Sequence, residues 1–230
     1  MPARTSYRDK DNLSDHDGGL KYAEMLRDEI IAQGPESVLA FAMEPVGGAS
    51  TGALVAPDSY YARVREICDE FGVLLIMDEV MSGVGRTGAF MATDHWNIRA
   101  DLYAVSKGFA AGYAPLGAMI ADEKMVDTVL DNGGFPHGHT YSGNPLACAA
   151  GLGVVGEIDR LGLIENTRVM GDLLMEGLRE LMARHSFVGD VRGKGLLTAF
   201  ELVADRDTMA PLPKELNAYE RFVEICYERR

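Results

Sequence analysis

Helical patterns alternate with short, continuous apolar runs through the first half of this 230-residue chain, and this alternation most constrains its fold. One helical pattern ends at Gly34-Pro35, and a second runs from Asp58 to Gly72, where glycine is expected to close it. The apolar run SVLAFAMEP lies between them, and VLLIM follows the second. Buried strands separated by helices are typical of a largely parallel sheet flanked by helices, so we predict an α/β fold.

The pattern changes after about residue 150, and two domains are expected. DLYAVS and APLGAMIAD are two further strands of the first domain, and Asn144-Pro145 should cap a long helix. A second helix, a glycine-broken pair of strands and a final helix follow. We therefore predict a large domain over residues 1–150 and a small, incomplete α+β domain over residues 151–230.

Charge and cysteine content exclude several classes of function. The formal net charge of −13 and the lack of a basic cluster argue against a nucleic-acid partner. Three widely spaced cysteines indicate a reduced, intracellular protein rather than a disulfide scaffold. No apolar run approaches the roughly 20 residues that span a bilayer, and the polar N-terminus has no secretory pattern. We expect a cytoplasmic protein with no membrane partner.

The segment VLLIMDEVMSGVGRTGAF contains two competing signals. Its G-V-G-R-T-G, from Gly83 to Gly88, fits the glycine pattern of a dinucleotide-binding loop. That loop needs its glycines directly after a strand and directly before a helix. Here Asp78 and Glu79 intervene, where their charges would repel a diphosphate, and no convincing helix follows Gly88. The dinucleotide interpretation is therefore disfavoured.

Three functional side chains are expected at the carboxyl ends of neighbouring strands, where chemistry collects in such sheets: Glu44, Asp78 and Lys107. A carboxylate there either forms a structural salt bridge or meets a cationic ligand nitrogen. Lys107 is the only basic residue between Arg99 and Lys124, in an apolar, glycine-rich segment. It is either a surface lysine or a desolvated amine that can attack carbonyl carbons. A lysine that forms a Schiff base and an aspartate that faces a ring nitrogen are what pyridoxal phosphate (PLP) chemistry requires.

A metal site is the other constellation that the sequence offers. His137 and His139 alternate, with Asp94 and His95 elsewhere in the chain, but they fall in the glycine- and proline-rich loop GGFPHGHTYSGNP. No third ligand has convincing spacing, so we expect no metal and disfavour a metal hydrolase.

Several segments together identify a family resemblance. They are AFAMEPVGGASTGALVAPDSYYARVREICDEFGVLLIMDEV, GVGRTGAF, YAVSKGFAAGYAPLGA and HGHTYSGNPLACAAG. In these segments, which run in the family's order, the chain resembles the class III aminotransferases, fold-type-I PLP enzymes that act on ω-amino groups and related amines. The resemblance covers most of the chain from about residue 20 onward.

The resemblance implies a role for each candidate residue. Lys107 would hold pyridoxal 5'-phosphate as a Schiff base and shuttle a proton, and Asp78 would pair with the ring nitrogen. Met81 would lie against one ring face, and Glu79 would also belong to the cofactor-binding set. Thr140 would bind the cofactor phosphate of a neighbouring subunit, which implies a homodimer. The substrates would be an amine donor and a keto acid such as pyruvate.

The chain also departs from the family's pattern. Ala49 stands where glutamate-gated relatives carry their gating residue, which favours the pyruvate-linked ω-amine group. Family members are about twice as long, so we expect a central-to-C-terminal portion with an exposed sheet edge and incompletely covered apolar faces. Such a chain should bind PLP weakly and transaminate poorly or not at all. The alternatives are a non-catalytic fragment or half of a split enzyme that only dimerises, and a PLP-dependent aminomutase or decarboxylase.

Overall fold

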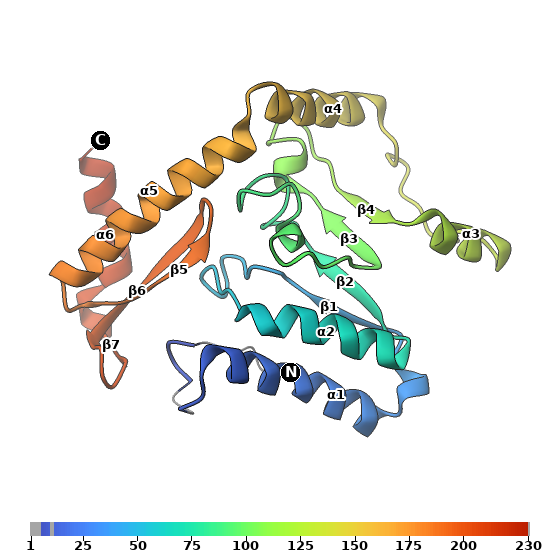
Figure 1. The fold of residues 1–230 in the computed structure, drawn as a ribbon. Helices are drawn as coiled ribbons and strands as arrows, with labels where there is room; N and C mark the ends of the chain where they lie inside the picture. The colour runs from blue at the N-terminus through green and yellow to red at the C-terminus, as the bar shows by residue number, and fades with distance from the viewer. Residues whose placement is uncertain (1–5, 10–11, 230) are drawn as a thin grey trace.

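The computed structural model describes residues 6–9 and 12–229, and its first part alternates helices and strands (Figure 1). The elements in chain order are α1 (Asp15–Gln33), β1 (Ala40–Met43), α2 (Asp58–Phe71), β2 (Leu74–Asp78), β3 (Leu102–Val105), β4 (Ala118–Ala121) and α3 (Glu123–Asp131). Short 3₁₀ turns are η1 (Pro35–Ser37), η2 (Ala92–Trp96) and η3 (Lys107–Phe109). The predicted α/β class is confirmed.

The four strands form one sheet in the order β1-β2-β3-β4. The first three are parallel, and the register places Asp78 opposite Ala104. β4 is antiparallel to β3. The connection between those two strands contains η3 and turns but no crossover helix, and only an antiparallel pair can be joined in this way.

Helices α1 and α2 cover one face of the sheet. Ser14 caps α1 by accepting the amide of Asp17, and Gly72 ends α2 in the left-handed conformation that glycine adopts at little cost. The expected apolar faces of these helices pack in one core with alternate residues of β2, namely Leu75 and Met77. The intervening residues of β2 are only half-buried, so the opposite face is incompletely covered, as predicted.

The second part consists of long helices and a small antiparallel sheet. It contains α4 (Pro145–Arg160), α5 (Leu163–Arg184), β5 (Val188–Lys194), β6 (Leu197–Asp205), β7 (Ala210–Pro211), η4 (Lys214–Leu216) and α6 (Ala218–Glu228). Asn144 caps α4 as expected, through the amides of Leu146 and Ala147. The division at residue 150 falls inside α4 and stays a prediction.

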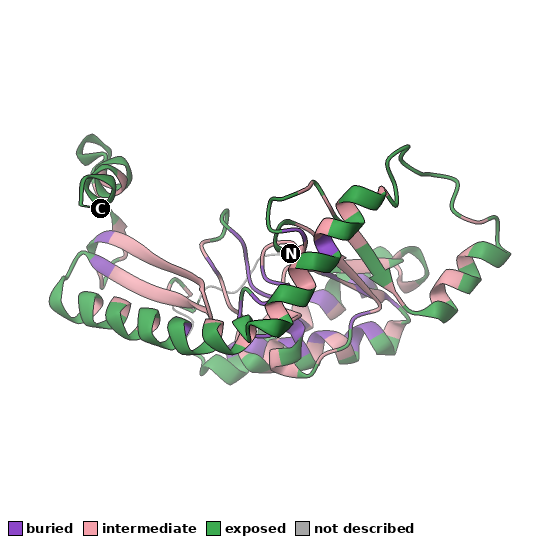
Figure 2. Cartoon of the chain, turned by 90° about the horizontal axis from the view of Figure 1, so that it is seen from above, coloured by how far each residue is buried: buried purple, intermediate pink, exposed green. Residues whose placement is uncertain are grey.

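Burial is concentrated around the main sheet, whereas α3, α5 and α6 are largely exposed (Figure 2). Leu173 on the expected apolar side of α5 is 61% exposed, so that side has no complete covering. Beneath it lies an apolar hollow of about 650 Å³ between α5, the β5–β6 hairpin and α6. None of the helices in the described part of the chain combines the length and apolarity that crossing a bilayer requires.

Candidate active site

The three functional side chains expected at strand ends do occupy one edge of the sheet. Glu44 directly follows β1, Asp78 ends β2, and Lys107 lies two residues after the end of β3. Because these strands are parallel and adjacent, their carboxyl ends meet at the same edge. The apolar strands thus bring two carboxylates and one amine to the same edge of the sheet.

Lys107 begins η3, and its amine donates to the Sδ atom of Met81 at 2.7 Å. Its φ of 42° is left-handed, a conformation that is uncommon for residues other than glycine and clusters at functional sites. The side chain is exposed, so of the two alternatives that the sequence left open, this chain shows a lysine at the surface. Met81, in the loop of residues 79–82 (the Met81 loop), contacts the amine on one side, and the apolar sequence around Lys107 does not fold over the other.

Asp78 has one carboxylate oxygen engaged and one available. Its Oδ1 accepts the backbone amide of Val80 at 3.0 Å, and the side chain is half-buried. Neither oxygen takes part in an ion pair among the described residues, so the structural salt bridge considered from the sequence is not found there. The arrangement leaves a carboxylate that can receive a cationic nitrogen.

Glu79 lies fully buried beside Asp78. Its Oε2 accepts the hydroxyl of Ser82 at 2.7 Å, and its Oε1 accepts the amide and the hydroxyl of Thr93 at 3.0 and 3.2 Å. The carboxylate therefore joins the chain before Met81 to the start of η2. Its geometry supports a role in holding the loop, and direct cofactor binding by Glu79 stays a prediction.

The glycine motif is a tight loop, not the opening of a helix. Gly85 and Gly88 have φ of 89° and 86°, and Val84 has a left-handed φ of 55°. A β-branched residue in that conformation costs about 1–3 kcal/mol, which the surrounding structure must offset. Only η2 follows, beginning at Ala92, so the disfavoured dinucleotide geometry is absent from this part of the described chain.

Three consecutive carbonyls of this loop are held by other parts of the chain. The carbonyl of Arg86 accepts the amide of Leu196 at 3.1 Å, that of Thr87 accepts Nε2 of His95 at 2.9 Å, and that of Gly88 accepts Nε of Arg168 at 2.7 Å. The pKa of His95 is lowered, by burial first and then by the charge of Lys194, which favours a neutral ring. Arg168 and Leu196 lie 80 and 110 residues from the carbonyls that they hold, so no local sequence pattern indicates them.

A hollow of about 270 Å³ opens beside the amine. It lies between the Met81 loop, the glycine loop, η3 and the ends of α4 and α5, and Val84, Arg86 and Gly108 line it with Lys107. It adjoins a wider depression of about 1340 Å³, which Lys107 and Arg86 also line. Two non-glycine residues with left-handed backbone, Val84 and Lys107, therefore face one concave space.

Thr140 does not join this site. It lies on the exposed loop between α3 and α4, next to Tyr141, which is 81% exposed. His137 and His139 lie on the same loop with their rings edge to face, 4.9 Å apart. Among the described residues, no three His, Cys, Asp or Glu side chains gather closely enough to hold a metal ion.

Comparison with known proteins identifies the family of this chain. The class III aminotransferase family matches residues 2–225, and the chain belongs to that family. It is 41% identical over 201 residues to a taurine–pyruvate aminotransferase of Bilophila wadsworthia, a match that covers 85% of this chain and 44% of that protein.

Solved structures of transaminases resemble this chain in fold. A transaminase from directed evolution by ancestral reconstruction superposes with a TM-score of 0.92 at 34% identity, over 99% of this chain and 50% of that one. A PLP-bound amine transaminase from an uncultivated Pseudomonas species gives 0.86 at 38% identity, over 91% of this chain and 48% of that one. The chain thus spans about half the length of the proteins it matches.

Proposed function

We propose that this chain carries the cofactor-binding lysine of a PLP-dependent aminotransferase that moves an amino group from an amine or ω-amino acid to a keto acid such as pyruvate. The single observation that supports it most is the contact of the Lys107 amine with Met81 beside a hollow, at the sheet edge where β2 ends in Asp78. A primary amine, a carboxylate with one free oxygen and a soft thioether suit a pyridinium aldehyde better than a metal or a diphosphate. The residues therefore fit the ring end of the cofactor.

Each residue has a separate task in this proposal. Lys107 would hold the cofactor through its amine and, when free, move a proton at the reacting substrate carbon. Asp78 would keep the ring nitrogen protonated through its second oxygen, and Met81, which contacts the amine, would orient it and lie against the ring. Bound PLP would supply the electron withdrawal that acidifies the C–H group of that carbon. Glu79 positions the loop between these groups.

We assign a homodimer to the working protein, with Thr140 reaching the cofactor phosphate of the second subunit. The exposed loop that carries Thr140, with Phe135 and Tyr141 at 54% and 81% exposure, supports this assignment. Large aromatic side chains on such a loop are suited to burial against another copy.

We infer that the chain alone binds PLP weakly and turns over slowly or not at all, because the Lys107 amine is exposed to water. The exposed apolar side of α5 and the exposed loop around Thr140 favour the second candidate, a cofactor-binding segment that dimerises or pairs with another chain without turnover of its own.

Alanine formation from pyruvate tests the proposal. The purified chain, PLP, pyruvate and a panel of amine donors are incubated at high protein concentration, with Lys107→Ala as the matched control. Slow alanine formation that disappears in Lys107→Ala supports a transaminase. Cofactor bound at Lys107 without alanine formation assigns the chain to the second candidate. Equal alanine formation by both proteins refutes the assignment of Lys107.

A further inference from the structure

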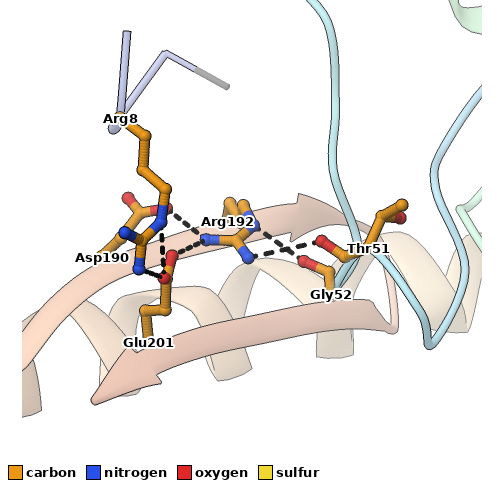
Figure 3. A network of polar contacts seen from close by, with 6 residues as sticks. All are labelled: Arg8, Thr51, Gly52, Asp190, Arg192 and Glu201. Carbon is orange, nitrogen blue, oxygen red and sulfur yellow. Dashed lines mark hydrogen bonds and ion pairs between the residues drawn. The ribbon is translucent and has the colours of Figure 1, made fainter. Parts of the chain in front are cut away.

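The β5–β6 hairpin reaches the loop after β1 through one arginine. Arg192 of β5 donates from Nε to the carbonyl of Gly52 at 2.7 Å and from Nη2 to the carbonyl of Thr51 at 3.4 Å (Figure 3). These partners lie 140 and 141 residues away in the chain. One side chain thus joins the C-terminal sheet to the loop of residues 47–52.

The guanidinium is itself held in place on its other side. Its Nη1 lies 2.7 Å from Oδ2 of Asp190 and 2.8 Å from Oε2 of Glu201, and Arg8 pairs with the second oxygen of Glu201 (Figure 3). The Arg192 side chain is 18% exposed. A planar guanidinium fixed by two carboxylates presents its remaining donors in one direction, which a lysine cannot reproduce.

The loop of residues 47–52 packs against Met81. The carbonyl of Gly48 accepts the amides of Thr51 and Ala53, both at 3.3 Å, so Gly48 is tied to the part of the loop that Arg192 holds. A Cβ atom on Gly48 would lie 3.0 Å from Cγ of Met81, so the backbone of the loop and this side chain are in direct contact. Met81 in turn accepts the amine of Lys107.

The same hairpin also contacts the glycine loop, residues 83–88, which follows Met81 in the chain. The amide of Leu196, in the β5–β6 turn, donates to the carbonyl of Arg86, and Gly195 lies against the backbone of Thr87 so closely that a Cβ would be 2.4 Å from it. Both loops that adjoin Met81 are therefore anchored to one two-stranded unit.

We propose that Arg192 is a positioning residue for Lys107: by fixing the loop of residues 47–52 it keeps Met81 against the lysine amine. The inference rests on the proposed function of Lys107 and extends it to a residue that touches neither the amine nor the hollow. It also gives the C-terminal hairpin a part in building the site.

The test compares Arg192→Gln with Arg206→Gln. Arg206 serves as the matched control because it also donates to backbone carbonyls of this region, those of Val188, Met182 and His185, without contacting the loop of residues 47–52. The first readout is competitive acylation of the folded chain, in which the rate at Lys107 is divided by the mean rate at the five other lysines of the chain. Since Lys107 is already exposed, general loosening does not raise its rate above theirs.

Arg192→Gln is expected to raise this ratio by about threefold, because loss of the anchor lets the loop move and releases the amine from Met81. The second readout is the PLP label fixed on Lys107 by borohydride, expected to fall by about tenfold. Arg206→Gln should change neither readout. Arg192→Lys should restore only part of each, since it keeps the charge beside Asp190 and Glu201 but not the fork.

Gly48→Ala leaves the ion pairs of Arg192 in place and puts a Cβ 3.0 Å from both Cγ of Met81 and Oε1 of Glu44, and it should shift the acylation ratio in the same direction. Unchanged ratios in both Arg192→Gln and Gly48→Ala overturn the proposal, and so does an equal change in Arg206→Gln. Lack of PLP label on the wild-type chain overturns the proposed function instead, and the acylation ratio then still decides the role of Arg192.

Discussion

Replacement of Glu79 by alanine should be among the most destabilising changes at the candidate site. Its carboxylate is fully buried and accepts three hydrogen bonds, from the hydroxyl of Ser82 and from the amide and hydroxyl of Thr93. Ser82 and Thr93 are fully buried as well, so water cannot replace the lost acceptor.

The structure sets the size of the effect. The hydroxyls can rotate toward other acceptors, but the Thr93 amide cannot, and an orphaned buried amide costs about 1–3 kcal/mol. Loss of the buried methylene groups adds about 1 kcal/mol or more for the cavity. We expect Glu79→Ala to lower the free energy of unfolding by about 2–4 kcal/mol. Glu79→Gln, which keeps the shape and one acceptor, should cost about 1 kcal/mol.

Urea unfolding followed by tryptophan fluorescence measures this directly. Trp96, the only tryptophan of the chain, belongs to the same η2 turn as Thr93 and stacks on Tyr61 with ring centroids 3.7 Å apart. A loss of about 2–4 kcal/mol corresponds to a midpoint about 1–2 M lower at a typical slope of about 2 kcal/mol per M. Glu66→Ala, which alters a side chain that is 64% exposed, is the matched control and should leave the midpoint near that of wild type. A Glu79→Ala midpoint within about 0.5 M of wild type would show that the Glu79 carboxylate does not hold the two segments together.

Three further predictions concern packing and protonation. Gly171→Ala should lower the free energy of unfolding by about 2–3 kcal/mol, because its Cβ would lie 2.6 Å from backbone atoms. Gly72→Ala, whose Cβ would meet no neighbour, should cost only about 1 kcal/mol for its left-handed φ. Equal urea midpoints for the two variants would contradict this difference. Burial raises the pKa of the Cys68 thiol to about 11, so a thiol reagent at pH 8 should modify the two exposed cysteines and spare Cys68 until the chain unfolds. Burial opposes ionisation of Glu201, yet two hydrogen-bonded guanidinium groups outweigh burial and lower the pKa of this carboxyl. The stability that Glu201 contributes should be present above its pKa in the unfolded state and be lost as the pH falls through its pKa in the folded state. Glu201→Gln should therefore make stability less dependent on pH in the acid range, and an unchanged pH dependence would count against the Arg192 ion pairs.

The strand ends could be predicted from the sequence because their signal is local. A continuous apolar run followed by Asp78 shows both that a strand is buried and where it ends, and Gly72 before it shows where the preceding helix stops. The helix cap at Asn144 could likewise be predicted from the two residues Asn144-Pro145. Parallel order then brings Asp78 and Lys107 to one edge without further information.

The supports of the site could not be predicted in the same way. The contact of Arg192 with Gly52 joins residues 140 positions apart, and nothing in either segment indicates the other. The sequence also left the exposure of Lys107 open, because apolar neighbours along the chain do not determine which segments fold over a side chain. Glu79 could be recognised as a strand-end carboxylate, but its partner Thr93 depends on how the glycine loop turns back.

The most direct test of the central claim is to mix the purified chain with PLP, reduce with borohydride and map the modified lysine by mass spectrometry, with Lys107→Ala as control. We expect a pyridoxyl group on Lys107 above the level on the five other lysines, and no comparable site in Lys107→Ala. Label scattered over the other lysines, or equal label in the two proteins, would contradict the account.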